Sequence, residues 1–238
     1  LLFFEFGNCY YFNSEKTATA EYPLKPYSED YHLGMWVTGN KSASNWAQKQ
    51  EKRTFYTLHA YVKNILSRIG IKKERQAVAE YSDSLLKAGL TISTPEGKRL
   101  VTLGVVSDAT AKVFDLDQEV EYADINWTNL MSEASRNNVT FADISKFPEV
   151  KRDLALLVKK ETTFAEIEKI ARETEKKLLK EVFLFDVYEG KNLEAGKKSY
   201  AVSFILKDET KTLTDSQIDG IMQKMIKNFE NKLEAKIR

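Results

Sequence analysis

The sequence is poor in the residues that build metal sites and thiol chemistry. It has one cysteine, Cys9, which excludes an intrachain disulfide, a cysteine-based metal cage and an iron–sulfur cluster. Its two histidines, His32 and His59, are too few and too far apart for a histidine cage. No histidine or basic cluster lies near Cys9 in the sequence, so we expect a small buried side chain in a strand rather than a nucleophile. We expect His59, which falls in a helical pattern, to be structural.

Charge of one sign and long apolar runs are also absent. The formal net charge is +1, so attraction to nucleic acid or to an acidic partner must come from a local patch. No apolar run approaches the ~20 residues of a membrane span. Together with the single thiol, this predicts no membrane partner and a reducing, cytoplasmic location. The chain begins without methionine and inside a strand-like pattern, and we therefore expect a fragment of a longer protein.

The residues that are present predict two globular domains. The 238 residues are 42% hydrophobic, 11% aromatic and 30% charged, and single domains usually have ~100–150 residues. The first part combines alternating apolar patterns with one amphipathic helix that should stop at Gly70. Its strands are expected at 1–12, 32–40, 89–106 (two strands around the turn PEGK) and 120–126, and its helix at 54–70.

Residues 132–146 are polar and without a sustained period, which predicts the joint between the domains in this stretch. We set the domains at 1–140 and 141–238. The second domain shows the order β-α-β-β-α-β, which is typical of the ferredoxin-like fold. Thr163 and Thr214 have capping-box spacing at the two helix starts. Its elements are expected at 152–158, 163–179, 181–190, 197–208, from 214 onward and at 235–238.

In the ferredoxin-like arrangement both helices cover one face of the sheet, and the other face stays available. Alternation assigns the bulky residues to the core and leaves a small, partly polar set opposite. Small side chains let a flat ligand such as a nucleobase approach the sheet, but they also suit packing against a second domain, which the pattern alone favours. The available set is Asp153, Ala155 and Leu157 in the first strand and Ser199, Ala201, Ser203 and Ile205 in the third.

Four stretches of the second half carry a family resemblance. FPEVKRDLALLV, LFDVYEG, GKKSYAVSF and DETKTLTDSQID, in this order and spacing, closely resemble the C-terminal anticodon-binding domain of bacterial phenylalanine–tRNA ligase beta subunits. The first half is similar to the preceding region of that subunit, a degenerate copy of the class II synthetase catalytic fold. The stretches that carry this similarity are FFEFGNCY, HLGMWVTG, TFYTLHAYVKNIL and LGVVSDATAKVFDL, with Ser107-Asp108 where the family commonly has His-Pro.

The resemblance implies an α+β chain, with an inactive class II synthetase-like antiparallel sheet domain followed by a ferredoxin-like βαββαβ domain. It implies roughly the last third of the subunit, without the editing module and without a catalytic site or cofactor of its own. The residues agree, because the first half offers scattered arginines and no glycine-rich phosphate loop. ATP and magnesium would serve the whole enzyme. The implied partners are the anticodon stem-loop of tRNA(Phe) and the catalytic alpha subunit in an α2β2 assembly.

Candidate tRNA contacts follow from the same strands. Arg152 and Asp153 point to opposite faces, so one of them can reach RNA. If Phe183, Phe185 and Val187 feed the core, the alternate residues of that strand share the available face, and a bulge would exchange the two sets. Tyrosine there could stack on a base, aspartate could accept from a base edge, and basic residues could hold phosphates. The candidates are Arg152, Asp153, Ala155, Asp186, Tyr188, Lys198, Ser199, Ala201, Ser203, Lys236 and Arg238.

Two other functions fit the pattern. A small ferredoxin-like domain can bind a metabolite and act as a regulatory module. It can also serve purely as a structural assembly module with both sheet faces buried. A basic open sheet favours RNA binding, whereas an apolar one favours these rivals.

Overall fold

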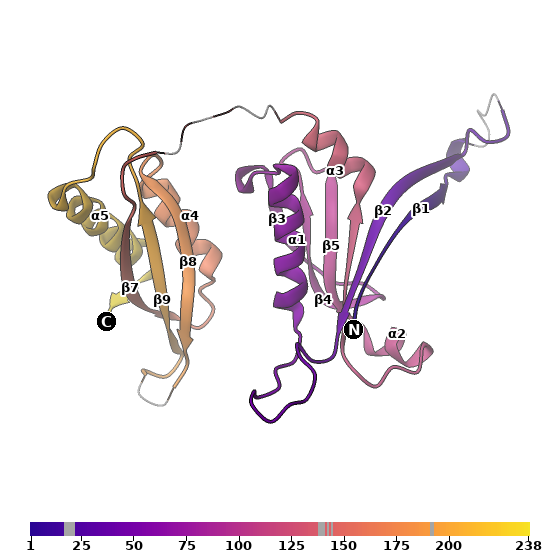
Figure 1. Cartoon of the computed structure of the whole chain (residues 1–238), viewed down its shortest axis with the longest axis horizontal. Coiled ribbons are helices and arrows are strands. Elements are labelled where there is room, and N and C mark those ends of the chain that lie inside the picture. The colour runs from indigo at the N-terminus through magenta and orange to yellow at the C-terminus, as the bar shows by residue number, and fades with distance from the viewer. Residues whose placement is uncertain (17–21, 138–140, 142, 144, 191–192) are drawn as a thin grey trace. The chain divides into compact units, whose positions relative to one another are not determined.

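The computed structural model of the chain describes residues 1–16, 22–137, 141, 143, 145–190 and 193–238. It divides into two compact units, Leu1–Thr140 and Phe141–Arg238 (Figure 1). Each unit combines an antiparallel sheet with helices, which confirms the predicted α+β class. Within the described ranges, no helix is long and apolar enough to cross a membrane.

The first unit is built on a six-stranded antiparallel sheet with the order β1-β2-β6-β5-β4-β3. The two longest strands, β1 and β2, form a hairpin whose outer strand is the sheet edge (Figure 1). The strands are β1 (Leu2–Phe12), β2 (Tyr27–Thr38), β3 (Ala77–Tyr81), β4 (Leu86–Ser93), β5 (Arg99–Val106) and β6 (Val120–Asn126).

The helices α1 and α3 of this unit pack on strands β2, β5 and β6. The predicted helix is α1 (Phe55–Ile69), and it stops at Gly70 in the left-handed conformation, with φ 88°. Its buried side chains Leu58, Val62 and Leu66 join the sheet residues in one hydrophobic core. The remaining elements are α2 (Asp108–Val113), α3 (Trp127–Ala134) and the short 3-10 helices Ser14–Lys16 and Lys73–Arg75.

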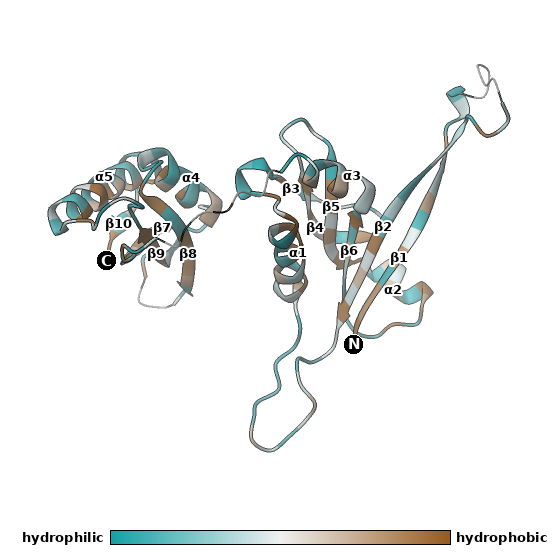
Figure 2. Cartoon of the chain, turned by 45° about the horizontal axis from the view of Figure 1, so that its top comes forward, coloured by the Kyte–Doolittle hydropathy of each residue, from teal (hydrophilic) through white to brown (hydrophobic). Residues whose placement is uncertain are grey.

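The second unit has the predicted β-α-β-β-α-β order and a four-stranded antiparallel sheet with the order β10-β7-β9-β8. Hydrophobic residues run along its strands and on parts of the two helices (Figure 2). Its core joins Leu156, Val202 and Phe204 of the sheet to Met225 and Phe229 of the last helix. Its elements are β7 (Val150–Lys159), α4 (Phe164–Thr174), β8 (Leu179–Tyr188), β9 (Lys197–Leu206), α5 (Asp215–Leu233) and β10 (Lys236–Ile237).

Both predicted capping boxes are present in this unit. The side chains of Thr163 and Thr214 accept hydrogen bonds from the backbone N–H groups of Glu166 and Gln217, whose side chains bond back to the caps. Each box satisfies N–H groups that a helix start leaves without a partner. The capping residues therefore fix where both helices begin, and hence how they lie on the sheet.

The strand β3, the helices α2 and α3 and the two short 3-10 helices of the first unit were not anticipated. The helix α2 begins at the Ser107-Asp108 pair, where the Ser107 hydroxyl accepts a hydrogen bond from the N–H of Thr110. Serine as cap and aspartate in the first turn both favour a helix start, which explains the turn at this departure from the family pattern.

The expectation that Cys9 is buried was wrong. Cys9 is exposed, and so is every residue of β1. The reason lies in the sheet order, because α1 and α3 pack on β2, β5 and β6 whereas β1 is the edge strand outside them. A strand pattern alone reports alternation and not which strand remains uncovered.

Candidate nucleic-acid interface

The sheet of the second unit has one face without helices, which we call the open face. Residues opposite each other on neighbouring antiparallel strands share a face, so the register identifies its members. The face opposite carries the core residues Leu156, Val202 and Phe204. Three rows cross the open face, namely Asp153–Ser203–Phe183, Ala155–Ala201–Asp186 and Leu157–Ser199–Tyr188, with Lys236 beside Leu157.

The strand β8 contains a bulge at Phe185. Its register on β9 shifts between Leu184 and Asp186. Upstream of the shift Val182 and Leu184 feed the core, so Phe183 lies on the open face and its assignment to the core was wrong. Downstream, Asp186 and Tyr188 share the open face as predicted. The bulge adds one residue and thereby brings Phe183 and Tyr188, five positions apart, onto the same side of the sheet.

Tyr188 and Arg238 form the most developed contact of this face. The guanidinium carbon of Arg238 lies 5.9 Å from the centroid of the Tyr188 ring. The backbone N–H of Arg238 donates to the carbonyl oxygen of Ala155 at 3.0 Å. Arg238 follows β10 beside Ala155, which is opposite Ala201, and Tyr188 lies in the next row with Ser199 and Leu157. A ring and a planar cation therefore lie close together on the open face.

Gly190 holds the Tyr188 ring close. A Cβ atom added at Gly190 would lie 2.1 Å from Cζ of Tyr188, much shorter than any real contact. Only glycine therefore lets the ring lie against the backbone at this point. Tyr188 is nevertheless 40% exposed.

Two lysines meet at Glu194, in the loop between β8 and β9. Glu194 accepts from Lys197 at 2.5 Å and lies 3.5 Å from the ammonium of Lys236. The hydrogen bond from Lys197, with the charges of both lysines, lowers the pKa of the Glu194 carboxyl. Two cations with one carboxylate leave a local excess of positive charge beside the open face.

Two candidates, Arg152 and Lys198, lie on the helix side of the sheet. Arg152 is opposite Phe204, and its guanidinium lies 3.9 Å from Asp215 in the first turn of α5. Lys198 is opposite Val158, with its ammonium 4.6 Å from the centroid of the Tyr200 ring. Of the adjacent pair Arg152 and Asp153, it is therefore the aspartate that reaches the open face.

Two more candidates are on the open face but buried in this chain. Ser203 is 0% exposed, and its hydroxyl donates to the carboxylate of Asp153. Ser199 is 7% exposed. Serine is short and lies in a middle strand between larger neighbours, so alternation places it correctly but cannot predict its exposure. Ser203 acts here by orienting Asp153.

The first unit contains a polar cluster on the sheet face away from α1, which sequence reasoning missed. Nδ1 of His32 lies 2.7 Å from Oδ1 of Asp124, and its Nε2 lies 3.2 Å from the Tyr11 hydroxyl. These residues line a small cavity of about 150 Å³. Nearby, burial raises the pKa of Tyr122 to about 12, so this phenol stays protonated. Period-two alternation in both strands was the available signal, but the register that joins His32 to Asp124 is not readable from the sequence.

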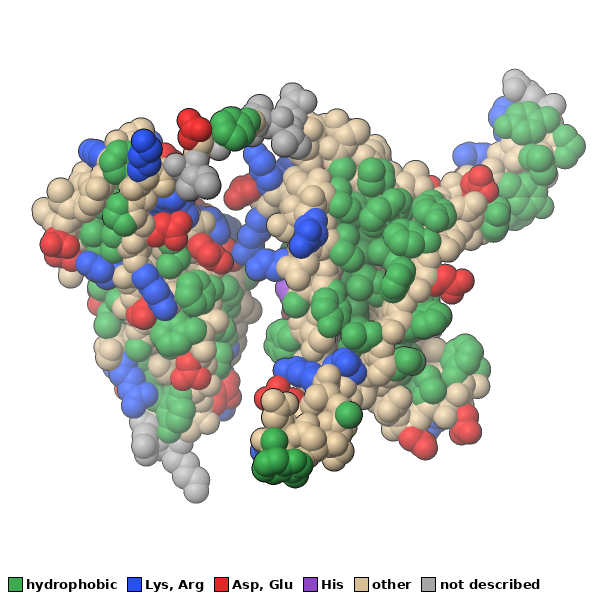
Figure 3. Space-filling model, viewed as in Figure 1, with side chains coloured by type: hydrophobic (Ala, Val, Ile, Leu, Met, Phe, Trp, Pro, Cys, Tyr) green, Lys and Arg blue, Asp and Glu red, His purple; other side chains and the backbone are tan. Residues whose placement is uncertain are grey.

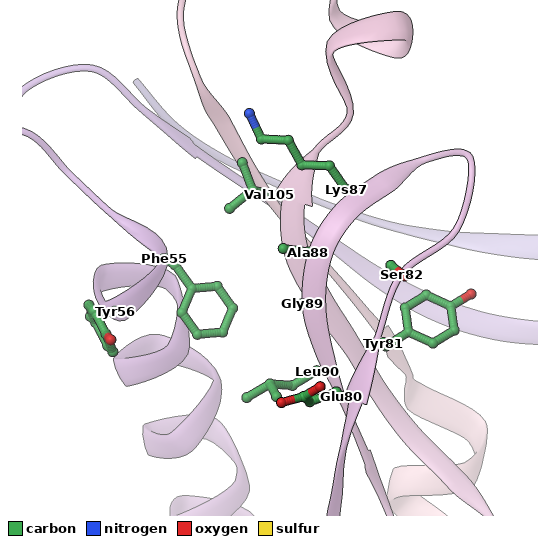
Figure 4. A pocket seen from close by; sticks show the side chains of 10 residues that line it. All are labelled: Phe55, Tyr56, Glu80, Tyr81, Ser82, Lys87, Ala88, Gly89, Leu90 and Val105. Atoms are coloured by element: carbon green, nitrogen blue, oxygen red, sulfur yellow. The ribbon is translucent and has the colours of Figure 1, made fainter. Parts of the chain in front are cut away.

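A wider groove of about 720 Å³ lies between α1 and strands β3, β4 and β5 of this unit (Figure 4). Phe55 points from α1 toward the strands, and Tyr56 points away from them. The groove is mostly apolar, and its lysine, Lys87, is already paired with Asp108 at 2.9 Å. Its chemistry suits apolar contact rather than phosphate binding.

The edge strand β1 carries a row of large exposed apolar side chains, which we call the β1 strip. It lies on the face that bears α1, because Phe4 and Phe6 are opposite Met35 and Leu33. Figure 3 shows hydrophobic side chains gathered over this part of the unit. The Phe6 ring stacks on Tyr31 at 5.7 Å between centroids. The strip consists of Leu2, Phe4, Phe6, Tyr10 and Phe12, which are 41–72% exposed.

Comparisons with known proteins agree with this architecture. The family model of the ferredoxin-fold anticodon binding domain matches residues 145–238, which lie in the second unit. The model of the phenylalanyl tRNA synthetase beta chain CLM domain matches residues 1–127. The chain belongs to the family of phenylalanine–tRNA ligase beta subunits, which confirms the expected family and fold class.

Proteins named phenylalanine–tRNA ligase beta subunit are similar over most or all of the chain. Those of Bacteroides fragilis and Porphyromonas gingivalis are 58% and 46% identical over 238 residues, which is the whole chain and 29% of each relative. That of Listeria monocytogenes is 31% identical over 210 residues, 88% of the chain and 26% of the relative. The chain thus spans less than a third of the length of these relatives.

Proposed function

We propose that the chain is a non-catalytic part of a phenylalanine–tRNA ligase and that its second unit binds the anticodon stem-loop of tRNA(Phe). The observation that carries this proposal is the Tyr188–Arg238 pair on the open face, next to the row of the small side chains Ala155 and Ala201. Aromatic rings beside cations over small residues are the usual platform for unpaired bases. The function belongs in the cytoplasm, where the ligase works.

In this proposal an unpaired base stacks on Tyr188, and the Arg238 guanidinium turns to a neighbouring phosphate. Asp186, in the alanine row, accepts a hydrogen bond from a base edge. Lys236 adds a second phosphate contact near Glu194. A stacked base contributes about 1–3 kcal/mol, so the platform can discriminate the anticodon while phosphate contacts supply affinity.

The composition of the open face favours RNA over a purely structural module. It carries the cations Lys151, Lys236 and Arg238 together with aromatic rings, rather than a continuous apolar surface. A purely structural module with both faces buried would leave these cations without water, which is costly.

Fluorescence anisotropy tests this proposal directly. The chain is titrated with a tRNA(Phe) anticodon stem-loop and with a loop of scrambled sequence, at several salt concentrations. We expect preference for the cognate loop, with log Kd rising linearly with log salt at about 0.7 per phosphate contact in single strands. Equal binding of both loops at every salt concentration contradicts anticodon recognition.

We further propose that the first unit is a catalytic-like domain without an active site that contacts the catalytic alpha subunit in an α2β2 assembly. ATP and magnesium are then handled by the alpha subunit. The β1 strip supports this, because contiguous exposed apolar surface of this kind marks a protein interface. The double variant Phe4→Asp, Phe6→Asp should lose co-elution with the alpha subunit in gel filtration, whereas Phe114→Asp, at an exposed ring elsewhere, should keep it. Unchanged co-elution of the double variant contradicts this docking site.

A further inference from the structure

A second group of rings and charge occupies the other end of the open face. Phe183 lies on this face, and Phe185, at the bulge, is 53% exposed. The ammonium of Lys151 lies 5.3 Å from the Phe183 centroid and 5.6 Å from the Phe185 centroid. One cation is therefore held against two rings, whereas Phe204 and Phe229 of the same unit are fully buried.

The rings position the Lys151 ammonium, and its ion pair with a carboxylate is long. Lys151 Nζ lies 3.8 Å from Asp153 Oδ1, and that carboxylate already accepts from Ser203. The lysine side chain is 53% exposed. A phosphate could therefore take the ammonium without breaking a short contact, and the rings would still flank it.

The new group is too far from Tyr188 to serve the same base. Phe183 and Tyr188 are separated by four regular strand steps and the bulge, or roughly 13 Å at ~3.3 Å per residue. Stacked bases in one strand are ~3.4 Å apart. A single base cannot cover both positions, so each ring group addresses a different nucleotide.

We propose that Phe183, Phe185 and Lys151 form a second nucleotide platform, on which an unpaired base of the same RNA loop stacks against Phe185 while Lys151 holds its phosphate. This rests on the proposed function, since it assigns the second end of the same open face to the same single-stranded RNA. The observations that favour RNA over an apolar protein surface are the centred cation and the continuity with the Tyr188–Arg238 pair on one face.

The test measures anisotropy of the chain with anticodon stem-loops that are intact or abasic at one loop position at a time. We expect Phe185→Ala to weaken the intact loop about tenfold. We also expect this variant to have no further effect on the loop that is abasic at the position Phe185 holds. Tyr188→Ala should likewise leave the affinity unchanged for one abasic loop, but for a loop that is abasic at a different position. Phe114→Ala, an exposed ring of the first unit, is the matched control and should bind as the parent chain does.

Lys151 is tested by its salt response. Lys151→Gln should lower the slope of log Kd against log salt by about one phosphate contact, whereas Lys227→Gln, on the exposed side of α5, should not. If Phe185→Ala disturbs the bulge, as thermal unfolding will show, Phe185→Leu replaces it, because leucine keeps the apolar bulk and removes the ring.

The outcomes separate the second platform from the proposed function. If Tyr188→Ala weakens cognate binding while Phe185→Ala and Phe185→Leu do not, the platform is wrong and anticodon binding stands. If the Phe185 variants weaken every abasic loop equally, Phe185 acts through structure and the platform is also wrong. If the parent chain does not distinguish cognate from scrambled loops, it is the proposed function that fails.

Discussion

The two units bury their cores in the same way but expose different kinds of surface. Each lays helices on one face of an antiparallel sheet and buries a separate hydrophobic core. In the first unit the uncovered apolar material lies at the edge, where β1 exposes Leu2, Phe4 and Phe6 beyond the helices. In the second unit the uncovered face holds alanine and serine in the middle and ring–cation pairs at both ends.

This difference supports the two different partners that we propose for the two units. Large exposed apolar side chains gain most from another apolar surface, because burial of apolar area drives protein association. Rings that already contact cations suit a ligand with a π face and a negative backbone, which is the chemistry of single-stranded RNA. The kind of side chain left exposed, more than the fold, separates an assembly surface from a recognition surface.

The largest expected effect comes from destabilising the core of one unit. Phe204 is 0% exposed and its ring lies 6.0 Å from that of Phe229, so Phe204→Ala should cost about 3–5 kcal/mol of the unfolding free energy of the second unit. All three tryptophans belong to residues 1–140, so tryptophan fluorescence follows the first unit alone. We expect the circular-dichroism transition to move and the fluorescence transition to stay, with Leu103→Ala as the reverse control. A joint shift of both signals contradicts separate cores.

The next prediction concerns recognition rather than stability. Tyr188→Ala should weaken binding of the cognate stem-loop about tenfold or more, because the stacking ring is lost. Tyr188→Phe keeps the ring and should bind nearly as the parent does. In the full enzyme Tyr188→Ala should reduce aminoacylation of tRNA but leave adenylation of phenylalanine unchanged, and a loss of adenylation would contradict the division of labour between the subunits.

A smaller loss of RNA affinity is expected from a change at Gly190, which lies against the Tyr188 ring. Gly190→Ala places a methyl group against Tyr188, which must leave its present rotamer. A displaced rotamer costs about 0.5–1.5 kcal/mol, or roughly a twofold to thirteenfold loss of affinity for the stem-loop. Gly196→Ala controls for glycine loss in the same loop region, since no atom lies within 4 Å of its added Cβ, although its positive φ (81°) adds backbone strain. Unchanged affinity of Gly190→Ala means that the ring position does not matter.

The smallest predicted effect concerns a buried carboxyl of the first unit, Glu121. Glu121 is 1% exposed, its Oε2 has no hydrogen-bond partner among the described residues, and burial raises the pKa of its carboxyl. The native state therefore holds this proton more tightly than the unfolded state, and stability is lost as pH rises through the native pKa. Glu121→Gln should raise the unfolding free energy of the first unit by about 1 kcal/mol at pH 7 and by little at pH 4. Urea unfolding followed by tryptophan fluorescence at both pH values measures this, and equal gains would contradict it.

The sequence predicted the regular parts of the fold well. The helix stop at Gly70, the caps at Thr163 and Thr214 and the six-element order of the second unit depend on local chemistry that one sequence displays. The shared face of Ala155, Ala201 and Tyr188 followed from alternation together with topology. The roles proposed for these residues in RNA binding stay predictions.

The parts that could not be predicted depend on neighbours in space. The bulge at Phe185 contains no glycine or proline. The local sequence therefore does not show that Phe183 lies on the open face instead of in the core. The exposure of Cys9 depends on which strands the helices reach, and the burial of Ser203 depends on side chains from two other strands. Alternation showed that Arg152 and Asp153 diverge but could not say which of them faces the helices.

The exposed Cys9 gives the edge strand a built-in reporter. It is the sole thiol of the 238 residues and lies on β1, so a maleimide dye would label one position of the unaltered sequence. Cys9 is opposite Asp30 and alternates with the β1 strip, so the dye would project from the other side of the strand. Its emission could then follow, in real time, how quickly a partner covers this edge and what fraction of a preparation is still uncovered.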